Sequence, residues 1–349
     1  MPITAQPIIQ EVIDAAAIRR LAEGKGMCLS FFLPDQKPGM SAGTHHSLLR
    51  QLARDAKPEA GELADAVNGL LADNRLKGNG PGLAIFCSAG TVEAFQVRGI
   101  QEPAFVTGQH FHLLPLLPTA FAPRQMFILG LARGHMRLFR YQDGAVTEET
   151  WPTTVPSSLD EAEHGRVEAI GNHASSGMSP SLMSSVQFGS SVRPDREGAG
   201  HHLTHFYQLV DAGLAPVLAG APLLLGGVAD DIAAYRKAAK YRAVLGQELA
   251  GSLEHKRASQ LTELVHEVST GQYFTDSERV LAACGELKNK LEDPQEIEKA
   301  ALDGRVSRLC VSQEARPLET CTAVAATLCA GGEVFAVRGK GSMVAALRY

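Results

Sequence analysis

Three histidines stand close together in the middle of the chain, in the stretch REGAGHHLTHFYQLVDAGL (residues 196–214). On a helix, His201 and His205 would lie one turn apart on the same face, a spacing at which two histidines can share a zinc ion. A zinc protease also needs a glutamate directly after the first histidine, and that position holds His202. The hydrolytic base is therefore missing. The pattern predicts no metal site and favours a polar or capping role at the start of a helix.

Two other sequence patterns that carry chemistry are missing too. The 349 residues contain no GxxxxGK[ST] phosphate loop and no CxxC zinc pair. The serines of HASSGMSPSLMSS (residues 173–185) indicate a polar loop rather than a nucleophile. The run RGKGSM (residues 338–343) indicates a hairpin turn, in which Arg338 and Lys340 could contact an RNA backbone. We therefore predict no cofactor and no standard hydrolase site.

The composition is that of a globular protein, with 45% hydrophobic and 20% charged residues. The net charge of −5 argues against a generic nucleic-acid coat and DNA binding, and leaves room only for a local basic patch. Six separated cysteines in apolar runs predict reduced, buried thiols in a cytoplasmic protein. The N-terminus does not read as a signal peptide, and the richest apolar stretch, FHLLPLLPTAFAP (residues 111–123), is too short and too proline-broken to cross a membrane.

Helices alternate with strands along the chain, which predicts the α/β class in three successive regions. The first, residues 1–123, contains a helix at 7–24, a buried strand (MCLSFFLP) and a hairpin (LAIFCSAGTVEAFQVRG). The second, residues 124–275, opens with a hairpin around Asp143-Gly144 and ends in a long helical region from residue 246. Between these lies a polar loop, residues 152–200, whose length indicates function or disorder. The third, residues 276–349, alternates helices with strands.

The order of these elements resembles the bacterial branch of the archaeo-eukaryotic class-I release factor family, which includes Pelota-like and Balon-like ribosome-associated proteins. The residues that carry the resemblance are CLSFFLP and FHLLPLLP in the first region, FILGLARGHMRLFRYQDGAVTEE and FYQLVDAGLAPVLAGAPLLLGGVADDIAAYRKA in the second, and AGGEVFAVRGKGSMVAALRY at the end. The resemblance implies three α/β domains. The middle one would have an RNase H-like mixed sheet, and the C-terminal one would be a small α/β/α layer.

Termination factors of this family bear Gly-Gly-Gln on the long loop of the middle domain, where it helps water attack the peptidyl-tRNA ester. In this chain Gly-Gly occurs only at 226–227 and 331–332, and neither pair precedes a glutamine. The loop's one glutamine is Gln187, and the codon-reading Asn-Ile-Lys-Ser motif is also absent. The resemblance therefore implies a translation factor that occupies the ribosomal A site, for hibernation or rescue, without codon-directed peptide release.

On this interpretation the partners are ribosomal RNA, P-site tRNA and an elongation-factor-like GTPase, with no membrane and no DNA. The residues predicted to contact RNA are Gln187, Arg193, Arg196, Gly198, Gly200, His201, His202 and His205 in the middle region, and Arg338 and Lys340 in the C-terminal turn. Two alternatives stay open. One is a peptidyl-tRNA or related ester hydrolase with a non-standard loop, using His173, Gln187 or His201. The other is a stress-related protein-interaction module.

Overall fold

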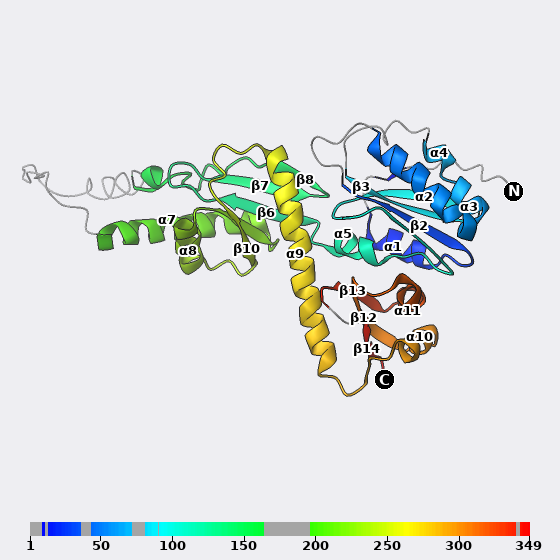
Figure 1. Ribbon diagram of the computed structural model, residues 1–349. Coiled ribbons are helices and arrows are strands. Elements are labelled where there is room, and N and C mark those ends of the chain that lie inside the picture. Colours follow the sequence, from blue (N-terminus) through cyan, green and yellow to red (C-terminus); the bar gives the residue numbers. More distant parts are fainter. Residues whose placement is uncertain are drawn as a thin grey trace, which may run out of the picture. The chain divides into compact units, whose positions relative to one another are not determined.

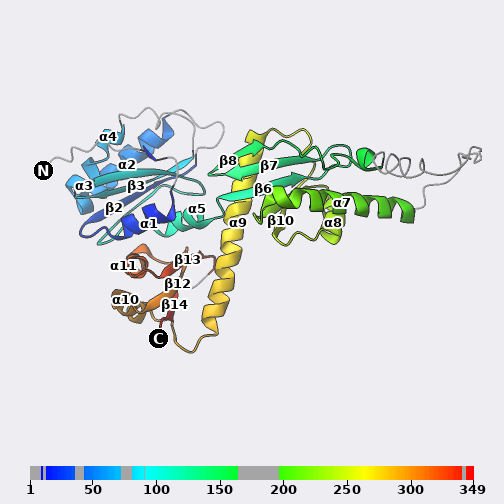
Figure 2. The same ribbon diagram turned by 180° about the vertical axis from the view of Figure 1, so that it is seen from behind.

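The computed structural model describes residues 9–10, 13–35, 43–71, 81–89, 91–163, 196–339 and 343–349. These residues form three sheets with helices against them, so the predicted α/β class is confirmed (Figures 1 and 2). Each predicted region holds one sheet. The contacts group the chain into two compact units, one of Met1–Ala122 with Ser269–Tyr349 and the other of Pro123–Val268. The predicted domain limits stay a prediction, and residues 275 and 276 both lie within one helix.

The first sheet belongs to the unit built from both ends of the chain. Its strands are β1 (Ile9–Gln10), β2 (Cys28–Leu33), β3 (Gly82–Ser88), β4 (Thr91–Val97) and β5 (Ala104–Gly108), in the order β1-β4-β3-β2-β5. Strand β2 is buried along its whole length, which explains its unbroken apolar sequence. One face packs against α2 (Thr44–Ala60), α3 (Glu62–Asp65) and α4 (Asn68–Leu71). The other packs against α1 (Ala15–Ala22), η2 (Leu114–Leu116) and α5 (Leu117–Phe121).

The last sheet completes the same unit. Its strands are β11 (Lys290–Leu291), β12 (Val306–Ser312), β13 (Glu333–Val337) and β14 (Met343–Leu347), in the order β11-β14-β12-β13. Helices α10 (Pro294–Leu302) and α11 (Pro317–Cys329) pack on it, and α11 carries the chain between the parallel strands β12 and β13. Apolar side chains of α1 and α5 share one core with those of α11 and β12, so the two ends of the chain fold together.

The middle unit has a mixed sheet, as predicted. Its strands are β6 (Gln125–Gly130), β7 (Arg137–Gln142), β8 (Ala145–Glu148), β9 (Leu223–Gly227) and β10 (Val244–Ala250), in the order β10-β9-β6-β7-β8. Strands β6, β7 and β8 are antiparallel, and β9 and β10 run parallel to β6. The predicted turn at Asp143-Gly144 joins β7 to β8, and both residues have the positive φ that such a two-residue turn requires.

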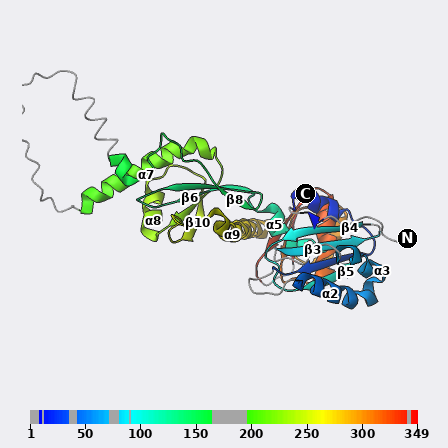
Figure 3. The ribbon, with the colours of Figure 1, turned by 90° about the horizontal axis from the view of Figure 1, so that it is seen from above.

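Helices cover both faces of this sheet (Figure 3). One face packs against α7 (Arg196–Leu218) and α8 (Ala229–Ala238). The other packs against the first part of α9 (Ala258–Gly285), whose last part belongs to the core of the other unit. The helical region predicted from residue 246 is wrong at its start, because residues 246–250 belong to strand β10, which pairs with β9. Pairing along the sheet edge outweighs the helical preference of this short segment.

None of the helices in the described part of the chain is both long and apolar enough to span a membrane.

Candidate functional site

Six of the eight residues predicted to contact RNA from the middle region lie in the first part of α7. Arg196, Gly198 and Gly200 lie within the first turns of this helix, so the glycines stand inside it rather than before it. His201, His202 and His205 are exposed on its outer face. Gln187 and Arg193 lie outside the described residues, as does the alternative catalytic residue His173.

His202 pairs with a carboxylate that precedes residues 164–195 in the chain; these residues are called the polar segment below. Its Nδ1 lies 2.9 Å from Oε1 of Glu163, the last described residue before the chain returns at Arg196. The pair therefore joins a residue inside the predicted polar loop, Glu163, to a residue just after it, His202. About half of each side chain is exposed, and solvent-exposed pairs of this kind contribute at most about 1 kcal/mol.

Residues 151–163 form a strap that is fixed to the unit by hydrogen bonds. The indole Nε1 of Trp151 donates to the carbonyl of Val155 (2.8 Å), and the amide of Met136 donates to the carbonyl of Ser157 (2.7 Å). The side chain of Val155 fills the space beside Gly213 of α7, where any Cβ would overlap it. The strap is thereby held against α7, although the sequence predicted this stretch as part of a long loop.

Glu161 anchors the end of the strap. Its Oε2 accepts hydrogen bonds from the amide and hydroxyl of Ser157 (2.7 and 2.9 Å), while its own amide donates to the hydroxyl of Ser158 (3.1 Å). These bonds stabilise the carboxylate, so the hydrogen bonds from Ser157 lower the pKa of Glu161. The side chain is therefore ionised at neutral pH.

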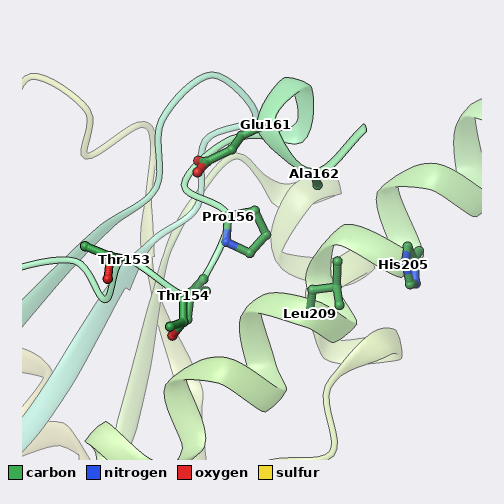
Figure 4. A pocket seen from close by; sticks show the side chains of 8 residues that line it. Thr153, Thr154, Pro156, Glu161, Ala162, His205 and Leu209 are labelled. Atoms are coloured by element: carbon green, nitrogen blue, oxygen red, sulfur yellow. The ribbon is translucent and has the colours of Figure 1, made fainter. Parts of the chain in front are cut away.

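A pocket of about 410 Å³ opens between the strap and α7 (Figure 4). Its described lining is Thr153, Thr154, Val155, Pro156, Glu161 and Ala162 from the strap and His205 and Leu209 from α7. Sequence reasoning found only His205 of this set. The signal that could have found the strap is the S-x-x-E pattern at residues 158–161, which is typical of a capped helical turn.

Two buried carboxylates hold α7 and α8 in place behind this pocket. Asp231 accepts from Nε of Arg133 (2.9 Å) and from its Nη2 (2.8 Å). Asp211 accepts from the hydroxyl of Tyr235 (3.0 Å) and from the backbone amides of Lys240 (2.8 Å) and Tyr241 (3.3 Å). Burial, followed by the Asp211 charge, raises the pKa of Tyr235, so it donates as a neutral phenol.

The predicted C-terminal contact lies in the other unit. The guanidinium of Arg338 is exposed and lies over the ring of Phe274, with its Cζ 4.3 Å from the ring centroid. This stacking orients the cation and leaves it available to solvent. Lys340 lies outside the described residues. Within the described residues, no three metal-binding side chains are placed to share an ion.

Comparison with known proteins gives a family match for the middle of the chain. Residues 124–271 match the family described as bacterial archaeo-eukaryotic release factor family 6. No curated protein matches the chain. Solved structures that the chain matches include an archaeal translation termination factor, aRF1, which has 15% sequence identity and a TM-score of 0.24, with 97% of this chain and 99% of that chain covered. Pelota of Archaeoglobus fulgidus has 9% identity and a TM-score of 0.41, with coverages of 97% and 94%. An archaeal Pelota described as ribosome-bound with ABCE1 has 10% identity and a TM-score of 0.35, with coverages of 97% and 95%.

Proposed function

We infer from the match of residues 124–271 to the bacterial archaeo-eukaryotic release factor family that this protein is a ribosome-associated translation factor. It occupies the A site of a vacant or stalled ribosome, in hibernation or rescue, and does not carry out codon-directed peptide release. An elongation-factor-like GTPase is its delivery partner, and ribosomal RNA and P-site tRNA are the surfaces it meets.

The observation that carries this proposal is the family match itself, which covers the strap, the polar segment and α7. Within that match the chain lacks the Gly-Gly-Gln tripeptide. Glycines at this position allow backbone angles that other residues cannot adopt, and the tripeptide's backbone amide stabilises the charge that develops during ester hydrolysis. A family member without it keeps the means of reaching a tRNA end and loses the means of cleaving the ester.

The exposed side chains of α7 supply the proposed RNA contact in the middle unit. His201, His202 and His205 present flat rings that can stack on unpaired bases or donate hydrogen bonds. Phosphate contacts come instead from cations elsewhere, such as Arg338, which is already oriented by Phe274. Because such contacts release few counterions, ribosome binding through them would depend only moderately on salt.

The test is co-sedimentation of the full-length protein with vacant ribosomes at low and at moderate salt. We expect pelleting with ribosomes at both salt concentrations. A variant with His201, His202 and His205 all changed to alanine should pellet several-fold less. A matched control with Glu278→Ala, an exposed residue of α9 in the other unit, should pellet as the wild type does.

Absence of the protein from the ribosome pellet at both salt concentrations would overturn the proposal. Release of labelled peptide from peptidyl-tRNA by the wild-type protein would instead favour the ester hydrolase. A pull-down that enriches only non-ribosomal proteins would favour the interaction module.

A further inference from the structure

The outer face of α7 carries no charged side chain over most of its length. Between residues 198 and 222 the only charged residue is Asp211, which is 5% exposed and already accepts three hydrogen bonds. The exposed positions hold histidine, glutamine, alanine, proline and two larger apolar side chains, Leu209 (39% exposed) and Val217 (37% exposed). Surface helices ordinarily present charged residues to water, so this face is unusual and suits an uncharged ligand surface.

The pocket lies along this face and has a carboxylate but no cation among its described lining residues. Glu161 is held ionised by its hydrogen bonds from Ser157, and it would repel a phosphate placed in the pocket. The same carboxylate would attract a group that donates N–H hydrogen bonds. Pro156 and Leu209 add apolar surface, His205 adds a flat ring, and Thr153 and Thr154 add hydroxyls.

We propose that this pocket binds one unpaired nucleobase that carries an exocyclic amine, namely adenine, cytosine or guanine. The volume of about 410 Å³ lies in the range of small-molecule sites. The amine donates to Oε1 of Glu161, because Oε2 is engaged by Ser157. The base stacks against His205, Pro156 and Leu209, and its sugar and phosphate stay outside the pocket. The inference rests on the proposed function for the source of the base, an RNA single strand.

The chain has one tryptophan, which makes the test direct. Trp151 donates its indole N–H to Val155, which itself lines the pocket, so its indole signal in the nuclear magnetic resonance spectrum reports on this site. Isotope-labelled full-length protein is titrated with adenosine, cytidine, guanosine and uridine, and with adenosine monophosphate. Stacking and one charge-assisted hydrogen bond predict dissociation constants on the order of a millimolar.

The expected result is saturable movement of the indole signal with adenosine, cytidine and guanosine, at an affinity roughly tenfold higher than that for uridine. Uridine has no exocyclic amine, and its one base N–H lies between two carbonyl oxygens that repel a carboxylate. Adenosine monophosphate should bind no better than adenosine. Equal binding of uridine, tighter binding of the monophosphate, or no movement with any nucleoside would overturn the proposal. A short cytidine-rich RNA that shifts the same signal would identify RNA as a source of the base.

Variants separate the two kinds of contact. Glu161→Gln removes the negative charge and should bring cytidine binding down to that of uridine. Leu209→Ala removes apolar surface and should weaken all nucleosides several-fold. Val217→Ala, which changes a similarly exposed side chain of the same helix outside the pocket lining, should leave every titration unchanged. An unchanged thermal unfolding curve shows that each variant is folded.

The nucleoside titration needs no ribosome, so it fails independently of the proposed function. Ribosome co-sedimentation without nucleoside binding would refute the pocket proposal and leave the translation factor standing. Nucleoside binding without co-sedimentation would refute the translation factor and leave the pocket proposal standing.

Discussion

In the unit formed by both ends of the chain, the described buried ionisable groups are thiols, imidazoles and the phenol of Tyr273, whereas the middle unit also buries carboxylates. All six cysteines lie in residues 1–122 and 269–349, and five of them are buried. There His112 Nδ1 lies 3.6 Å from Sγ of Cys321, and its ring meets Phe32 edge to face. Residues 123–268 contain no cysteine and bury Asp211 and Asp231 against donors. Among the described residues, only the middle unit therefore has hydrogen-bond networks built on fully buried carboxylates, and these networks hold α7 and α8.

The largest loss of stability is expected when a carboxylate of the buried network is removed. Asp211→Ala leaves the hydroxyl of Tyr235 and the amides of Lys240 and Tyr241 without their acceptor. We expect the middle unit to lose about 3–5 kcal/mol of stability, measured by denaturant unfolding followed by Trp151 fluorescence. Asp65→Ala, which removes an exposed pair with Lys57, should cost less than about 1 kcal/mol. Equal losses of stability in the two variants would mean that the buried network stabilises the fold no more than an exposed ion pair does.

The other unit should respond to acid through His112. Burial lowers the pKa of His112 to about 4, so its neutral form is favoured in the folded state. Its contribution to stability is complete above the unfolded pKa of about 6.5 and is lost as the pH falls from there toward 4, at up to about 1.4 kcal/mol per pH unit. Calorimetry between these pH values should show this loss in the wild type and a smaller one in His112→Asn. His201→Ala, which changes an exposed histidine, should keep the wild-type dependence.

The contact between the strap and α7 is tested by adding one methyl group. Gly213→Ala places a Cβ against Val155, so the strap must shift or the helix must bend. We expect a loss of about 1–3 kcal/mol and a displaced Trp151 indole signal. The double variant with Val155→Ala should recover most of the loss. Gly246→Ala is the control, because a Cβ there meets no atom within 4 Å.

The smallest effect is expected at the pair that borders the polar segment. His202→Ala should change the stability of the middle unit by less than about 1 kcal/mol, because both partners are half exposed. The denaturant midpoint followed by Trp151 fluorescence measures it. A loss as large as that of Asp211→Ala would show that this surface pair, and not only the buried network, holds α7.

Local patterns in the sequence predicted the elements whose reasons are local. The apolar run of β2 and the hairpin at Asp143-Gly144 were predicted in this way, whereas the mixed middle sheet was implied only by the family resemblance. Elements that depend on distant partners were not. Strand β10 was predicted as helix, because its pairing with β9 is invisible in its own residues. The shared core of α1 and α11 joins segments some 300 residues apart, and no local periodicity announces it.

The candidate site was predicted in part for the same reason. The histidines of α7 were found because they stand out in the sequence. The strap was not predicted because its roles depend on tertiary contacts. Val155 packs beside Gly213 of α7, and the indole of Trp151 donates to the carbonyl of Val155. Of the predicted residues, Arg338 is placed by its ring contact with Phe274, which could not be read from the spacing of the two residues.

The discontinuous unit has a consequence for synthesis. The middle unit is a continuous stretch, Pro123–Val268, so all of its strands have been made before the last eighty or so residues are added. The core shared by α1, α5, α11 and β12 has to wait for the final part of the chain. During translation, the apolar side chains of α1 and α5 that contact the C-terminal elements therefore stay uncovered while the middle unit is made. The middle unit can therefore complete its fold before the unit that contains the N-terminal region does.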